Sequence, residues 1–195
     1  MNINNQLFLI SLMPLLLTGC AAAVVGAAAG AAGTTATIAH DRRTTGTFIE
    51  DQAIELKAVK SFFLDKEIND SSHINVTSIN TVVLITGETP REDIRNRIVN
   101  IVRDIPKVTH VYDELTIAAP SSWTSRGSDS LITSKVKIRL LTLDDFDGTR
   151  VKVVTEKGVV YLMGLLTRSE SDIATGEAQQ LGGVQKIVKL FQYID

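Results

Sequence analysis

The chain repeats itself at a spacing of 77 residues, and this repeat constrains the fold more than any other feature. Residues of the same type recur at this spacing, as in Val83 and Val160, Gly87 and Gly164, and Arg91 and Arg168. Near the C-terminus the spacing becomes 76, where Val108 corresponds to Val184. A period this long that occurs twice indicates two copies of one small domain rather than a solenoid. The 195 residues suffice for two such domains.

Each copy is expected to begin with a helix, over residues 47–65 and 128–143. Apolar residues at helical spacing predict these helices: Leu56, Val59 and Phe63 in the first copy, and Ile132, Val136, Leu140 and Leu143 in the second. The second set is expected to face a core. The repeat pairs Val59 with Val136 and Phe63 with Leu140.

The rest of each copy is expected to form two strands, a helix and a third strand. The expected strands are 73–78, 81–87 and 108–117 in the first copy, and 150–155, 159–164 and 184–194 in the second. Hairpin turns are expected at Ile79-Asn80 and at Glu156-Lys157-Gly158, and second helices over 91–104 and 169–181. This order predicts an α+β fold in which two helices pack on a small three-stranded mixed sheet, formed twice.

The αββαβ order resembles the BON-domain family, and the resemblance covers about residues 45–195. Its most specific segments are residues 82–87 (Val-Val-Leu-Ile-Thr-Gly), 131–137 (Leu-Ile-Thr-Ser-Lys-Val-Lys) and 160–167 (Val-Tyr-Leu-Met-Gly-Leu-Leu-Thr). The resemblance implies BON domains over 46–117 and 128–195, joined by a linker over 118–127. Gly87 and Gly164 match the glycine that closes the second strand in this family. We expect each to have a positive φ or a close backbone contact.

The N-terminus carries a second motif, Leu17-Thr18-Gly19-Cys20, which closes an apolar run. It resembles the lipobox of bacterial lipoproteins, in which the signal peptide is cleaved before the cysteine and the thiol receives diacylglycerol. The motif predicts a signal peptide over 1–19 and a lipidated Cys20 followed by an Ala/Gly-rich linker over 20–45. Residues 1–6 contain no Lys or Arg, which a signal peptide usually has. The alternative is an uncleaved membrane anchor, because no charged side chain occurs before Asp41 and about 20 apolar residues suffice to span a bilayer. Residue 21 is Ala rather than Asp, and the resemblance then implies anchoring at the periplasmic face of the outer membrane.

The sequence contains no recognisable catalytic or metal-binding motif. The three histidines, His40, His73 and His110, show no metal-ligand spacing, and no nucleophile elbow or phosphate loop occurs. The acidic run at residues 144–148 fails the EF-hand pattern, because Arg150 stands where that loop needs Gly. The net charge of −2 argues against nucleic acid as a partner. We therefore expect neither enzymatic activity nor a cofactor or metal.

The helix over 128–143 differs from its counterpart, because it carries a second apolar stripe and cations. Leu131, Ile138 and Leu141 fall on a different face from the expected core residues. Lys135 and Lys137 flank this stripe, and Arg139 follows. Apolar residues edged by cations fit the interface of an anionic phospholipid layer. Three cations would contribute about 3 kcal/mol. The alternative is that the stripe packs against the first copy.

The resemblance implies the same use of this helix, since outer-membrane lipoproteins with two BON domains bind anionic phospholipids through it. The expected partners are phosphatidylglycerol and cardiolipin, and the expected contact residues are Leu131, Ser134, Lys135, Lys137, Ile138 and Leu141. The family often has Trp where Leu131 stands, and Trp123 is the aromatic residue that could serve instead. The predicted role is support of outer-membrane integrity, and the resemblance also implies a role at division sites. The alternative is a protein-interaction module that docks to an envelope or peptidoglycan-associated machine.

Overall fold

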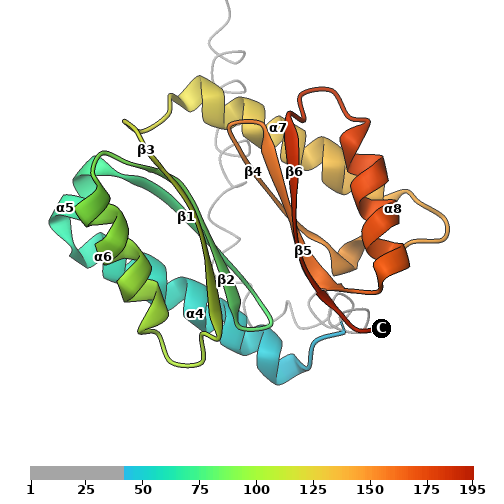
Figure 1. Cartoon of the computed structure of the whole chain (residues 1–195), viewed down its shortest axis with the longest axis horizontal. Coiled ribbons are helices and arrows are strands. Elements are labelled where there is room, and N and C mark those ends of the chain that lie inside the picture. The colour runs from blue at the N-terminus through green and yellow to red at the C-terminus, as the bar shows by residue number, and fades with distance from the viewer. Residues whose placement is uncertain (1–41) are drawn as a thin grey trace, which may run out of the picture. The chain divides into compact units, whose positions relative to one another are not determined.

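The computed structural model describes residues 42–195, which contain two copies of one α+β domain (Figure 1). The first domain consists of α4 (Thr45–Leu64), α5 (Lys66–Ser71), β1 (His73–Ile79), β2 (Val82–Thr89), α6 (Glu92–Arg103) and β3 (His110–Ile117). The second consists of α7 (Trp123–Leu141), a 3-10 turn (Gly148–Arg150), β4 (Lys152–Glu156), β5 (Val159–Leu166), α8 (Arg168–Gln179) and β6 (Lys186–Tyr193). The predicted signal peptide, Cys20 and nearly all of the linker over 20–45 lie outside the described residues.

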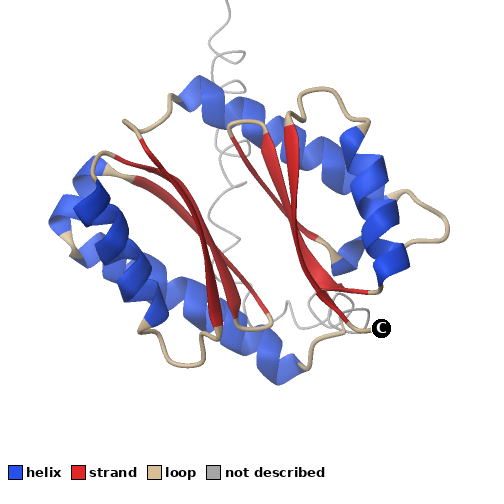
Figure 2. Ribbon diagram, in the orientation of Figure 1, coloured by secondary structure: helices blue, strands red, loops and turns tan. Residues whose placement is uncertain are grey.

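Each domain forms a three-stranded mixed sheet with helices on one face, as predicted (Figure 2). The strand orders are β1-β2-β3 and β4-β5-β6, in which the first pair is antiparallel and the second parallel. The antiparallel pairs are joined by two-residue turns whose central residues all have positive φ: Asn80 50°, Thr81 66°, Lys157 49° and Gly158 74°. These are the values of a type I′ turn, which matches the twist of a hairpin. Both predicted hairpins are therefore confirmed, but the first turn is Asn80-Thr81 and not Ile79-Asn80, because Ile79 still pairs with Val82 in the sheet.

Two helix boundaries differ from the prediction, and a capping side chain explains each one. The Asp65 carboxylate accepts a hydrogen bond from the Ile68 amide at 3.2 Å and starts α5, a short helix that the repeat did not indicate. The Ser122 hydroxyl accepts from the Ser125 amide at 3.2 Å, so α7 begins at Trp123 and not at residue 128. A capping oxygen satisfies an amide that the helix leaves unpaired. The segment expected as a linker thus ends at Ser122.

The first helices of the two domains correspond at a spacing of 78 residues, one more than the strands. Equivalent buried residues show this: Asp51 and Asp129, Ile54 and Ile132, Ala58 and Val136, and Phe62 and Leu140. The expected pairings of Val59 with Val136 and of Phe63 with Leu140 are therefore wrong. One residue turns a helix by about 100°, which places Leu56, Val59 and Phe63 outside the core, where they are 69%, 56% and 71% exposed. Of the expected core residues in α7 and after it, Ile132, Val136 and Leu140 are buried and Leu143 is partly buried.

Gly87 and Gly164 are required by a close backbone contact. A Cβ atom at Gly87 would lie 2.0 Å from the carbonyl oxygen of His73, and one at Gly164 would lie 2.4 Å from that of Arg150. Gly87 also has a φ of 120°. Both glycines lie inside β2 and β5 rather than at their ends. The expected close contact is confirmed at both positions, although neither glycine closes its strand.

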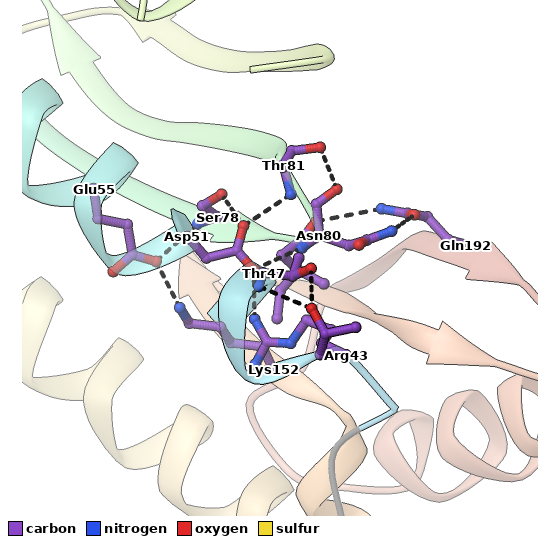
Figure 3. Close-up of polar contacts among 11 residues, drawn as sticks. Arg43, Thr47, Asp51, Glu55, Ser78, Asn80, Thr81, Lys152 and Gln192 are labelled. Carbon is purple, nitrogen blue, oxygen red and sulfur yellow. Dashed lines mark hydrogen bonds and ion pairs between the residues drawn. The ribbon is translucent and has the colours of Figure 1, made fainter. Parts of the chain in front are cut away.

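The two sheets share a third core in addition to the core of each domain. It is formed by apolar side chains from strands of both domains: Ile79, Leu84, Val154, Tyr161, Met163 and Leu190. Polar contacts surround it, including Asn80 Nδ2 to Gln192 Oε1 at 2.7 Å and Lys152 Nζ to Glu55 Oε1 at 2.6 Å (Figure 3). Each sheet thus buries one face under its helices and part of the other against its neighbour, which joins the domains into one compact unit.

Candidate functional site

Three large apolar side chains of α7 remain uncovered in the structure. Leu131, Ile138 and Leu141 are 65%, 62% and 56% exposed, while the opposite side of the helix is buried in the core of the second domain. The expectation that this stripe packs against the first domain is therefore wrong, because that domain does not cover it. A stripe of this kind on an otherwise packed helix marks an interaction surface.

A buried carboxylate fixes α7 on its sheet. Asp129 accepts hydrogen bonds from the backbone amides of Lys157 and Gly158, both at 2.9 Å, at the turn between β4 and β5. Thr133 adds a bond from its hydroxyl to that of Thr155 at 2.8 Å. Asp129 and Thr133 both hold the inner side of the helix. Together with the core residues they determine which face α7 turns outward.

Two of the three expected cations are available for a ligand. Lys135 and Lys137 are exposed, and no described residue forms an ion pair with either. Arg139 donates to Glu177 Oε2 at 2.6 Å, so its charge is already matched. The Ser134 hydroxyl donates to the Ser130 carbonyl at 2.8 Å. A phosphate oxygen can only accept, so Ser134 in this rotamer offers it no proton.

Trp123 extends the exposed stripe toward the start of α7. It is 84% exposed, and the guanidinium of Arg126 lies 4.9 Å from the centre of its ring. Eighteen residues, or five helical turns, separate Trp123 from Leu141, so both lie on the same side of the helix. An aromatic residue at one end of an apolar stripe suits the boundary between lipid and water.

A hollow of about 570 Å³ lies beside this surface and is bordered by α7 and by the edge strands β1 and β4. Ser134 and Lys137 line it, so two of the expected contact residues face this hollow. Glu156 also lines the hollow, and burial, followed by repulsion from Glu88 and Asp129, raises its pKa to about 7. Burial lowers the pKa of His73, which lines the opposite wall, and the charge of Arg126 lowers it further.

The described residues contain neither a metal-binding cluster nor a helix that could span a membrane. Within residues 42–195 no three His, Cys, Asp or Glu side chains gather in a way that could hold a metal ion. The acidic run at residues 144–148 forms a loop in which Phe146 is buried. None of the described helices is both long and apolar enough to cross a bilayer.

Sequence reasoning missed two features of the first helices. One is the pair of buried carboxylates, Asp51 and Asp129, which each bind the turn of the following hairpin. The signal was present, because each Asp lies three residues before the first core residue of its helix, Ile54 or Ile132. The other is the exposed apolar face of α4, which the one-residue error in the helix alignment concealed.

Comparison with known proteins gives a consistent family assignment. The model of the BON domain matches residues 51–119 and 128–195. The chain is 35% identical to the outer membrane lipoprotein DolP of Haemophilus influenzae, over 92% of this chain and 91% of that protein. It is 30% identical to a 21 kDa hemolysin of Actinobacillus pleuropneumoniae, over 79% of each chain. The osmotically inducible protein Y of Escherichia coli is also 30% identical, over 73% of this chain and 72% of that one.

Proposed function

This chain belongs to the BON-domain family, and from that premise we propose that it is a non-enzymatic outer-membrane lipoprotein that binds anionic phospholipids through α7. In this proposal Cys20 carries the acyl anchor at the periplasmic face. The second domain then contacts phosphatidylglycerol or cardiolipin in the same membrane. The role is support of outer-membrane integrity, with a contribution at division sites implied by the family.

The observation that carries the proposal is the exposed stripe of Leu131, Ile138 and Leu141 between two lysines that have no ion-pair partner among residues 42–195. Each cation near an anionic surface contributes about 1 kcal/mol. Lys135 and Lys137 together would strengthen binding about thirtyfold. This is less than three cations would provide, because Arg139 is held by Glu177.

The test uses the chain from residue 21, which lacks the proposed anchor and retains all cores, since these lie within residues 42–195. Sedimentation with vesicles of phosphatidylethanolamine, with and without phosphatidylglycerol or cardiolipin, measures its binding. We expect Leu131→Glu combined with Ile138→Glu to weaken binding to anionic vesicles at least about tenfold, because two buried apolar contacts are lost and two negative charges are gained.

The matched control is Ile117→Glu combined with Ile173→Glu, which adds the same charge at two exposed residues of other elements. Equal binding by the two double variants, both folded by circular dichroism, would refute the role of α7. A wild-type chain that ignores anionic vesicles but crosslinks to a single envelope protein in stoichiometric amounts would favour the protein-interaction role.

A further inference from the structure

The first helix of the first domain also presents a large apolar face to solvent. Five of its side chains are 56–71% exposed: Ile49, Leu56, Val59, Phe63 and Leu64. All but Leu64 lie along one side of α4, since steps of three, four and seven residues separate them. Phe63 and Val59 also border an apolar hollow of about 180 Å³. An exposed patch of this kind costs free energy in water and indicates that something covers it.

The charges around this face favour an anionic partner. Lys57 and Lys60 are exposed on α4, and neither forms an ion pair with a described residue. Two of the acids of α4 are engaged elsewhere: Asp51 is buried in its hydrogen-bond network, and Glu55 is held by Lys152 at 2.6 Å (Figure 3). Lys60 lies within about 60° of Leu56 and Phe63 around the helix, whereas Lys57 lies about 100–120° from them, on the same side as Glu50. The apolar face is thus bordered on one side by an unmatched cation, Lys60.

The first turn of α4 lies near α7 in the structure. A hollow of about 210 Å³ is lined by Phe48 from the first turn of α4 and by Lys137 from α7. Ile49, where the apolar face of α4 begins, follows Phe48, and the exposed Ile138 follows Lys137. Lys152 borders the same hollow and holds Glu55 of α4. The N-terminal end of α4 therefore lies close to the second half of α7.

The chain also enters the described structure at α4. Arg42 precedes this helix by three residues, and its guanidinium binds Glu170 at 2.6 Å. Only 22 positions separate Arg42 from Cys20 (42 − 20). A segment of that length spans at most about 75 Å. If Cys20 carries the anchor, the folded part stays within this distance of the bilayer, and linkage of this kind raises the effective concentration of a weak site.

We propose that α4 is a second membrane-binding helix, and that α4 and α7 form one surface that contacts an anionic bilayer. This inference rests on the proposed function and extends it from one helix to two. Phe63, Leu56 and Val59 enter the boundary of the acyl chains, while Lys57 and Lys60 contact headgroup phosphates. Two weak contacts on one rigid body then act together, so that each strengthens the other.

Insertion can be observed directly with the complete lipidated chain in vesicles. Phe63→Trp is introduced together with Trp123→Phe, which leaves one tryptophan on α4. Lipids with brominated tails quench tryptophan fluorescence on contact. We expect strong quenching and a blue shift in vesicles that contain phosphatidylglycerol. Ile173→Trp in the same background is the control, because Ile173 is exposed on α8, outside the proposed surface. Equal quenching at both positions, or none at Phe63→Trp, would overturn the proposal.

A binding measurement separates the two helices. In the unanchored chain from residue 21, Leu56→Glu with Phe63→Glu is expected to weaken sedimentation with anionic vesicles about tenfold. Lys57→Gln with Lys60→Gln should weaken binding to anionic vesicles several-fold. This variant leaves the apolar residues of α4 unchanged, so a loss of binding cannot be attributed to misfolding caused by apolar-to-charged substitutions. If the α7 variant abolishes binding while both α4 variants bind like wild type, the proposed function stands and this inference fails. If wild type does not bind, both fail. The inference about α4 is also refuted if α4 crosslinks to a second copy of the chain and its tryptophan is not quenched by brominated lipids.

Discussion

At the scale of single residues, two buried carboxylates decide how each domain is assembled. Asp51 accepts bonds from the hydroxyl of Ser78 at 2.6 Å and from the amides of Asn80 and Thr81 at 2.8 Å, and it pairs with Arg43 at 2.7 Å (Figure 3). Asp129 binds the equivalent turn of the second domain through two amides. Hydrogen bonds to a charged acceptor are stronger than neutral ones. Each carboxylate therefore joins a helix to a hairpin.

Replacing either carboxylate by an amide should destabilise the protein. An Asn side chain presents an NH₂ group to amides that can only donate, and at position 51 the change also removes the charge that Arg43 contacts at 2.7 Å. We expect Asp51→Asn to lower the free energy of unfolding by about 2–4 kcal/mol and Asp129→Asn by about 1–3 kcal/mol. Urea titration measures both. Asp145→Asn, at an exposed loop position, is the control and should change stability by less than about 0.5 kcal/mol. A similar value for all three variants would contradict this account.

At the scale of elements, glycines in the helices and glycines in the strands have opposite effects on stability. Gly127 in α7 and Gly176 in α8 have open space where a Cβ atom would be placed. Gly164 in β5 and Gly87 in β2 have a backbone carbonyl oxygen there instead. The helical glycines cost conformational entropy, whereas the strand glycines allow the approach of a neighbouring chain segment.

Alanine substitutions should separate these two classes. Gly127→Ala and Gly176→Ala should each raise the free energy of unfolding by about 0.5–1 kcal/mol, because alanine favours a helix interior. Gly164→Ala should lower it by more than about 2 kcal/mol, and Gly87→Ala by more still, since its φ of 120° adds strain to the clash. Thermal unfolding measures all four. A stable Gly164→Ala would show that the strand edge can move away without cost.

At the scale of the whole molecule, a carboxyl group buried near both domains links stability to pH. Glu156 is 8% exposed, and its raised pKa of about 7 follows from burial and from the nearby Glu88 and Asp129. Lys157 and Arg126 oppose this effect. Glu88 belongs to the first domain. Burial raises its pKa, but the contact with Lys157 and the hydrogen bond from the backbone amide of Ser121 outweigh burial, so the pKa of Glu88 is lowered. The interface therefore holds one carboxyl that favours its protonated form.

The sign of the pH effect follows from this pKa. Between about pH 4.5 and pH 7 the folded state retains a proton on Glu156 that the unfolded state has lost, so this residue's contribution to stability falls as pH rises through that range. We expect Glu156→Gln to be more stable than wild type at pH 8 by about 1–3 kcal/mol, and the difference to shrink toward pH 5. His73 acts in the opposite direction, but it is present in both proteins and cancels in the comparison. A difference that does not vary with pH would contradict the assignment.

The repeat and its apolar spacing were enough to predict two α+β domains, their mixed sheets and their hairpins. These features depend on local periodicity and on turn geometry, which a sequence displays directly. The same spacing correctly identified Ile132, Val136 and Leu140 as core residues and Leu131, Ile138 and Leu141 as a separate stripe. The short helix α5 and the early start of α7 escaped prediction, because each depends on one capping oxygen, at Asp65 or Ser122.

Only the tertiary structure decided which face of α4 is buried. The strands repeat at 77 residues and the first helices at 78, and a shift of one position turns a helix face by about 100°. Position 63 thus appears equivalent to a core residue in the sequence and is 71% exposed in the fold. The pairing of Arg139 with Glu177 and the third core between the sheets are likewise contacts between distant segments. Periodicity fixes the type of each element, but packing alone determines which side chains are left to meet a partner.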